Sequence, residues 1–213
     1  MCTLAQILLS TALLSTVALA QSNEETTAAN NPFSLLDDAY QVKAFANLTA
    51  SGASNIIDLT NAGTVGGNDN TDYICANVYV FAQDQQLISC CTCPLSPNSL
   101  QNLWSPELIG NKLTLGIPSG ITVGLVATAD YGPGTCNAAI PGFLVPGLRA
   151  WGTTVHIAGG TPYLTETPFS KVGLGFSEYY KMTSFCGFIQ EDGSGAGICA
   201  SCQVGASGAA KAN

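Results

Sequence analysis

Charged side chains are scarce in this chain. Only 9% of its 213 residues are Asp, Glu, Lys or Arg, against about 25% in ordinary globular domains. The six Lys and Arg residues are scattered from Lys43 to Lys211, and the formal net charge is −8. Nucleic-acid phosphates are bound by clustered basic residues, so we expect no nucleic-acid partner. So few charges also leave little repulsion against self-association.

Catalytic and metal-binding patterns are equally sparse. His156 is the only histidine, and its place in an alternating strand-like segment favours a structural role over catalysis or metal binding. The chain has no G-x-S-x-G elbow, and the glycine run at 193–197 lacks the strand and spacing of a dinucleotide fingerprint. We therefore predict no enzyme activity, catalytic residue, cofactor or metal. A hydrolase remains an alternative, because two carboxylates need only meet in space. The candidates are Glu107, Asp130, Glu166 and Glu178.

One long apolar run is present, at residues 4–20, and it ends in Ala-Leu-Ala before a polar segment. This pattern predicts a signal peptide over residues 1–20, cleaved after Ala20, although no Lys or Arg precedes the run. An uncleaved anchor is the alternative, but the run is shorter than the ~20 residues of a usual span. We expect a secreted or cell-surface protein with no membrane contact after cleavage.

Eight cysteines follow the leader, and an even number in an exported chain predicts four disulfides. Cys90 and Cys91 are neighbours on an expected strand, so their side chains should face opposite ways and find different partners. Zinc binding and a thioredoxin-like redox role for Cys199 and Cys202 are the alternatives, but the CC-x-C spacing is irregular for a zinc knuckle. The eight predicted disulfide residues are Cys75, Cys90, Cys91, Cys93, Cys136, Cys186, Cys199 and Cys202.

Hydrophobic periodicity predicts a mainly β fold. A hairpin of strands 74–81 and 87–93 carries four of the eight cysteines. In segment 40–48 the alternating apolar residues from Tyr40 to Leu48 share one face, while Gln41, Lys43 and Asn47 share the other and Phe45 is the exception. Further strands are expected at 56–59, 112–116, 121–129 (central), 148–157 and 163–169 (at an edge). The proline-rich segment 94–106 is expected to be a link.

The period changes near Ser177, which can cap a helix over residues 178–191. Its predicted buried face consists of Tyr179, Met182, Phe185, Cys186 and Ile189. A disulfide from Cys186 would hold the helix on the sheet. We thus predict an antiparallel β-sandwich with one C-terminal helix, comprising a flexible arm at 21–39, one domain at 40–202 and a flexible tail at 203–213.

Three binding features are weaker. The loop 67–72 offers clustered oxygen ligands from Asn68 to Asp72 for calcium, although an ordinary turn explains them as well. Asn47-Leu-Thr49 matches a glycosylation sequon. Trp104 and Trp151 could stack on a glycan, or lie in the core.

Three motifs, CANVYVF at 75–81, CCTCP at 90–94 and CGFIQEDGSGAGIC at 186–199, resemble those of uncharacterised exported cysteine-rich bacterial proteins. The resemblance implies no activity or site. We expect a non-enzymatic extracellular structural protein, such as a self-assembling surface or filament (pilus-like) subunit that adds residues 21–48 to a neighbour's sheet. The alternatives are a monomer whose strand pairs within its own domain, and a secreted carbohydrate-binding or adhesive module.

Overall fold

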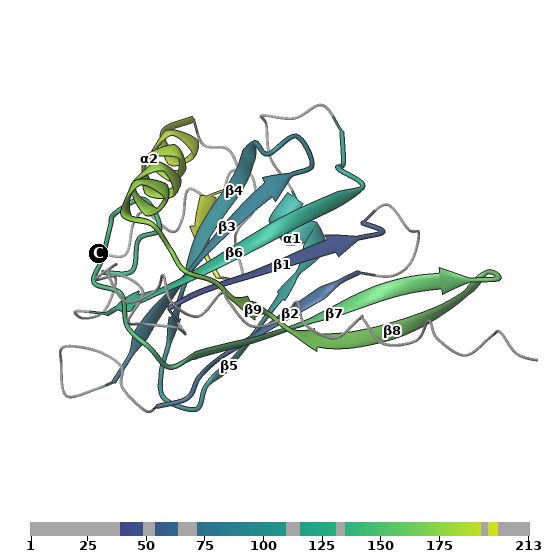
Figure 1. Ribbon diagram of the computed structural model, residues 1–213, viewed down its shortest axis with the longest axis horizontal. Coiled ribbons are helices and arrows are strands. Elements are labelled where there is room, and N and C mark those ends of the chain that lie inside the picture. The colour runs from purple at the N-terminus through teal and green to yellow at the C-terminus, as the bar shows by residue number, and fades with distance from the viewer. Residues whose placement is uncertain are drawn as a thin grey trace, which may run out of the picture.

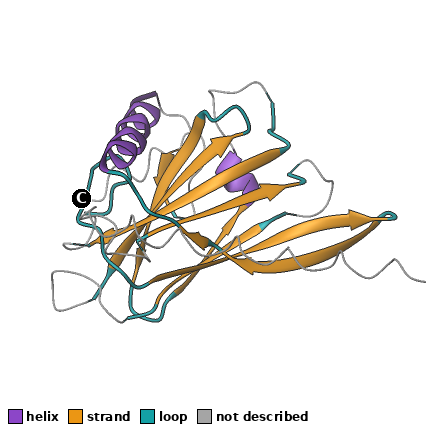
Figure 2. Ribbon diagram, in the orientation of Figure 1, coloured by secondary structure: helices purple, strands orange, loops and turns teal. Residues whose placement is uncertain are grey.

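The computed structural model describes residues 39–48, 54–63, 72–109, 116–130, 135–192 and 196–199. Two β-sheets form a sandwich-like arrangement, and a long helix covers the outer side of one sheet (Figures 1 and 2). The predicted mainly β fold with a C-terminal helix and disulfides is therefore confirmed. The signal peptide and almost all of the arm and tail lie outside the described residues.

The larger sheet, sheet A, has the strand order β10-β4-β3-β6-β1-β9. Its neighbours pair antiparallel, except that β10 runs parallel to β4. The predicted hairpin is present as β3 and β4, and β6 is central as expected. The strands are β1 (Tyr40–Ala46), β3 (Ile74–Ala82), β4 (Leu87–Leu95), β6 (Gly120–Ala129), β9 (Ser170–Lys171) and β10 (Ala196–Ile198).

The smaller sheet, sheet B, has the order β5-β2-β7-β8, so β8 lies at an edge as predicted. The expectation of an irregular link at 94–106 is wrong, because this segment contains β5 and leads into the short helix α1 (Ser105–Ile109). Leu103 and Leu108 are both fully buried there, so packing against the core stabilises a segment whose prolines argue locally against regular structure. The strands are β2 (Ile56–Asn61), β5 (Leu100–Trp104), β7 (Leu148–Ala158) and β8 (Thr161–Pro168).

Both faces of sheet A are covered, which explains the nearly continuous apolar sequences of β3 and β6. Val78 and Leu125 point into the core between the two sheets, together with Leu59 from β2. Tyr79 and Val126 point into a second cluster beneath the long helix α2 (Phe176–Asp192). The expected strand 112–116 lies outside the described residues, apart from Gly116, which is in a bend.

The buried face of β1 is the opposite of the predicted one. Gln41 and Phe45 are buried, whereas Ala44 and Ala46 are exposed. The Phe45 ring supplies more apolar area than an alanine, so it turns this face toward the core between the sheets. Gln41 can follow because its Nε2 donates a hydrogen bond of 2.8 Å to the Leu148 carbonyl, which compensates the burial of the amide.

Helix α2 begins two residues before the predicted start, so Ser177 lies within it and is not its cap. Four of the five predicted buried residues are buried, but Phe185 is 58% exposed and Thr183 is buried in its place. The Cys186 disulfide fixes which side of the helix faces the sheet. Thr183 lies three residues before Cys186 and shares that side, whereas Phe185 is rotated away from it by about 100°.

Candidate functional site

Strand β1 is the last long strand toward one edge of sheet A, followed there only by the short β9. It pairs with β6 over seven residues, from Tyr40↔Val126 to Ala46↔Gly120. On its other edge the two-residue β9 covers only Gln41 and Val42. Among the described strands, β1 is therefore held mainly by a single neighbour, and most of its outer edge is unpaired by backbone.

Two side chains of β1, Phe45 and Lys43, extend toward sheet B. Phe45 is 3% exposed and tilts against Phe169, with 6.0 Å between the ring centroids. Lys43 lies beside it, with its ammonium 5.5 Å from the Phe45 ring centre, and donates a hydrogen bond to the Thr167 hydroxyl. Burial lowers the pKa of Lys43.

Gly152 in β7 makes room for this pair of side chains. A methyl group at Gly152 would lie 2.6 Å from Cζ of Phe45 and would also overlap the Lys43 side chain. Sequence reasoning missed this contact, although a glycine inside a predicted strand is itself a signal of close approach by another segment. The residues that surround the β1 side chains therefore come from sheet B as well as from sheet A.

No residue of β1 is a cysteine, whereas the elements after it are crosslinked. The described disulfides join Cys75 to Cys136, Cys90 to Cys186 and Cys93 to Cys199, with Cα–Cα distances of 5.4, 5.8 and 4.7 Å. Cys91 is disulfide-bonded too, and Cys202 lies outside the described residues. Since the sulfurs of the proposed zinc cluster that the structure describes are all in disulfides, they offer no thiolates to a metal.

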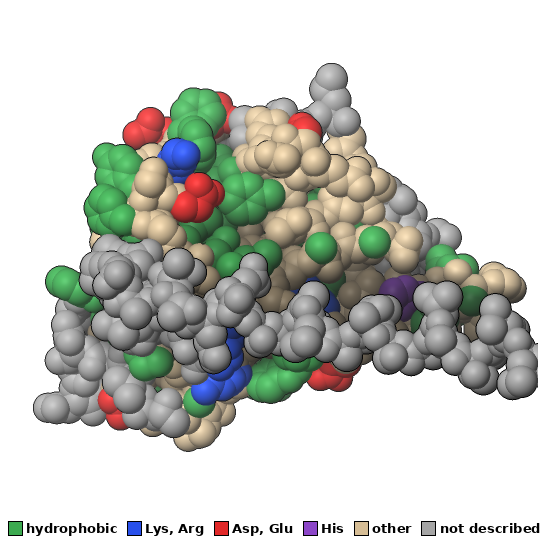
Figure 3. Space-filling model, viewed as in Figure 1, with side chains coloured by type: hydrophobic (Ala, Val, Ile, Leu, Met, Phe, Trp, Pro, Cys, Tyr) green, Lys and Arg blue, Asp and Glu red, His purple; other side chains and the backbone are tan. Residues whose placement is uncertain are grey.

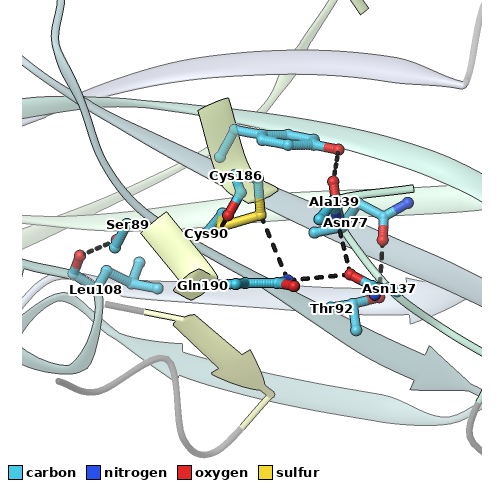
Figure 4. Close-up of a disulfide and its surroundings, with 11 residues drawn as sticks. Asn77, Ser89, Cys90, Thr92, Leu108, Asn137, Ala139, Cys186 and Gln190 are labelled. Carbon is cyan, nitrogen blue, oxygen red and sulfur yellow. Dashed lines mark hydrogen bonds between the residues drawn. A yellow bond between two sulfur atoms is a disulfide. The ribbon is translucent and has the colours of Figure 1, made fainter. Parts of the chain in front are cut away.

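Neighbouring cysteines on β4 face opposite ways, as predicted. Cys90 belongs to the cluster beneath α2, and Cys91 to the core between the sheets. The Cys90–Cys186 bridge pins α2 to sheet A, which confirms the expected role of Cys186. Figure 4 shows this bridge with Gln190 beside it, where the Gln190 amide donates to Asn137 at 3.0 Å and to the Cys186 sulfur at 3.7 Å.

A buried polar network accompanies the bridge. The Asn77 amide nitrogen donates to the Thr128 hydroxyl at 3.0 Å. Its oxygen accepts from the Thr92 hydroxyl at 2.8 Å, a bond that Figure 4 shows. The Tyr79 hydroxyl donates to the Ala138 carbonyl at 2.7 Å. Burial, with a smaller contribution from nearby Tyr179, raises the pKa of Tyr79 well above its usual value. The Asn77 contacts join β3 to β4 and β6, and the Tyr79 contact holds Ala138 beneath the helix, so these buried polar groups have hydrogen-bond partners.

One group of possible metal ligands occurs among the described residues. The sulfurs of Cys75 and Cys136 and a carboxylate oxygen of Asp130 lie within 4.8 Å of one another. The two sulfurs form a disulfide, and Asp130 accepts a hydrogen bond of 2.6 Å from the Thr135 hydroxyl. We assign this group to anchoring the segment that carries Cys136.

The predicted catalytic candidates lie on separate elements. Asp130 follows β6, Glu107 is in α1, Glu166 is in β8 and Glu178 is in α2. Glu107 accepts a hydrogen bond of 3.4 Å from the Trp104 amide, which is the geometry of a helix start. His156 stacks on Tyr163 across β7 and β8, with ring centroids 4.9 Å apart, and contacts the Thr165 hydroxyl at 2.7 Å. These contacts join β7 to β8 through the His156 side chain.

Trp104 and Trp151 come together on the outer face of sheet B. Trp104 is 48% exposed and Trp151 is half-buried. They lie on β5 and β7, on either side of β2, where Trp104 pairs with Ile56 and Trp151 with Asp58. From strand spacing and rise, their Cα atoms are about 12 Å apart. Asp58 lies between them and accepts a hydrogen bond from Asn102.

Several predicted binding features fall wholly or partly outside the described residues. The calcium loop does, apart from Asp72, whose carbonyl accepts a hydrogen bond of 2.8 Å from Asn61. Asn47 of the sequon is described, and its Nδ2 donates to the Val155 carbonyl at 3.1 Å, while Thr49 is outside. Neither described helix has the length and apolar content of a membrane span.

Comparisons with protein-family models, with curated proteins and with solved structures found no match to this chain.

Proposed function

We propose that this protein is an extracellular structural subunit that assembles by exchanging strand β1 between copies. The observation that carries the proposal is the position of β1. It is the first described strand, it is paired along most of one edge only, and it precedes every cysteine of the disulfide network. A copy can therefore release β1 without breaking a disulfide, and a neighbour's β1 can remake the same contacts.

The connection after β1 fits this exchange. Nine residues, 47–55, join β1 in sheet A to β2 in sheet B. Strand exchange moves a terminal element of a domain from one copy to another by changing the connection that joins it to the rest of the domain, here residues 47–55. Phe45 and Gln41 would then fill the same positions in the neighbour, so the exchanged and unexchanged states have closely similar contacts. The disulfides, together with the signal peptide expected from the sequence, support an extracellular setting for such a subunit.

A pair of cysteines across the β1–β6 ladder tests the exchange. Ala44 and Thr122 are register partners, and antiparallel partners lie within disulfide reach. In the variant with Ala44→Cys and Thr122→Cys, exchange links one chain to the next and gives ladders on a non-reducing gel that collapse on reduction. Each single substitution is the matched control. The proposal fails if the double variant forms only an intramolecular bridge and the mature chain shows no polymers by electron microscopy at high concentration.

A second candidate function is glycan binding by the outer face of sheet B. It is favoured by the two tryptophans that this face presents about 12 Å apart, with the polar Asp58 and Asn102 between them. Indole faces stack on sugar rings, and the intervening polar groups can bond to hydroxyls. Binding to a glycan array that is lost in Trp151→Ala, and kept in the control Tyr163→Ala on β8, would support this function. Equal binding by both variants would argue against it.

A further inference from the structure

Helix α2 presents aromatic side chains to solvent as well as to the core. Phe176, Tyr180, Phe185 and Phe188 are 61%, 58%, 58% and 60% exposed. Figure 3 shows hydrophobic side chains gathered at the end of the molecule where Figure 1 places α2. Phe176 and Tyr180 stack one helical turn apart, with 6.5 Å between ring centroids. Phe185 lies about 180° around the helix from Phe176, so we call Phe176, Tyr180 and Phe188 the aromatic face.

The segment beside the helix extends this surface. Tyr179 and Gln190 of α2 are hydrogen-bonded to Gly142 and Asn137, so residues 137–143 run along the helix. Within this segment Ile140 is 61% exposed and Phe143 is 73% exposed. An aromatic side chain buries about 200 Å² when it is fully covered. The aromatic face and its two neighbours therefore expose roughly 600 Å², the upper end of the range for the largest apolar patch of a typical monomer.

We propose that the aromatic face is a homodimer interface, in which α2 of one copy packs antiparallel against α2 of a second copy. Two such surfaces together bury about 1,200 Å², which is the lower end of the range for a standard stable interface. The few charges of the chain leave little to oppose the contact. This interface is separate from β1, so it forms whether or not strands are exchanged.

The sequence of α2 suits a two-fold axis near Ser184. Tyr180 and Phe188 each lie four residues from Ser184, on either side. An antiparallel pair centred there places Tyr180 of each copy against Phe188 of the other. Ser184 is exposed and small, so the two helices can approach closely at the crossing point.

Sedimentation of the mature chain tests the dimer. We expect a reversible dimer with a micromolar or tighter dissociation constant, strengthened by salt because salt screens the net charge of −8 on each copy. Phe188→Ser, which changes both halves of the symmetric contact, should weaken it by at least about tenfold. The matched control Tyr163→Ser removes an aromatic side chain of similar exposure on β8 and should leave the dimer intact.

A cysteine at the proposed axis supplies the geometric test. Ser184→Cys should give an oxidised dimer, whereas Ser170→Cys on β9 should not. To separate this interface from strand exchange, the same measurements are made on the variant with Ala44→Cys and Thr122→Cys bridged within each chain. The aromatic-face dimer persists there, while exchange is blocked. A mature chain that stays monomeric, a dimer unaffected by Phe188→Ser, or a monomer that binds lipid vesicles through Phe188 would each overturn the proposal.

Discussion

Two of the three described disulfides, Cys90–Cys186 and Cys75–Cys136, should contribute to stability in the reverse order of their sequence separations. Cys90 and Cys186 are 96 residues apart, and Cys75 and Cys136 are 61 apart. For isolated crosslinks, loop-closure entropy gives about 4.7 kcal/mol for the longer loop and about 4.3 kcal/mol for the shorter one. Taken alone, these values predict that losing Cys90–Cys186 is the costlier change.

The structure changes this estimate, because Cys93–Cys199 already joins the same two parts of the chain. Cys93 lies three positions after Cys90, and Cys199 lies thirteen positions after Cys186. With that bridge closed, Cys90–Cys186 closes a loop of only about 16 residues, which corresponds to about 3.1 kcal/mol. The Cys75–Cys136 loop is not shortened by the other described bridges and keeps its value of about 4.3 kcal/mol.

The assay is urea unfolding of two variants under non-reducing conditions. In each variant one cysteine of the pair becomes Ala and the other Val, which keeps the buried volume close to that of the disulfide. We expect the variant without Cys75–Cys136 to be less stable by about 1.2 kcal/mol. With a urea slope near 2 kcal/mol per molar, this is about 0.6 M in the midpoint.

The opposite order would refute this reasoning, since it would mean that the two bridges to the C-terminal segment act independently. The chain with all its disulfides intact is the reference for both variants. Peptide mapping must also show that the remaining cysteines keep their partners in each variant.

Three further predictions concern the buried contacts. Gly152→Ala should lower the free energy of unfolding by about 1–3 kcal/mol, because the new methyl group overlaps Phe45; combining it with Phe45→Leu should recover part of the loss in a urea titration. Asn77→Ala should lower the free energy of unfolding by about 2 kcal/mol in the same measurement, because it leaves the buried Thr128 hydroxyl without its Asn77 hydrogen bond. A variant of a surface asparagine should cost far less. Stability should fall as the pH rises above about 10, because the pKa of Tyr79 is raised in the folded state and lies near 10.0 when unfolded. That contribution is fully present below the unfolded pKa and is lost as the pH passes the folded pKa, so Tyr79→Phe should flatten the alkaline limb of stability against pH. A limb unchanged by the substitution would contradict the assignment.

Local patterning predicts the elements of this fold well where strands or helices are long. β-branched and aromatic residues predicted the hairpin of β3 and β4, and the change of period predicted α2. β5 and α1 could not be predicted in the same way, since Pro97 and Pro106 flank or interrupt them. They form because Leu103 and Leu108 are buried by residues distant in sequence.

The candidate site was only partly predictable. The sequence indicated that segment 40–48 is a strand near the start of the domain, and the structure shows this strand paired within its own chain. Periodicity identifies which side chains of a strand share a face, but a neighbouring layer decides which face is buried. Phe45 marks the buried face of β1, although it interrupts the alternation of apolar residues in segment 40–48.

By itself, the sequence determined that the chain is mainly β with one long C-terminal helix, and that Cys90 and Cys91 face opposite ways. These features follow from the backbone periods of strands and helices. Only the tertiary structure decided which cysteines pair, which face of β1 enters the core and that four of the five aromatic side chains of α2 remain exposed. Those outcomes depend on which segments come within a few ångströms of one another, and that proximity is set by the packing of the whole chain.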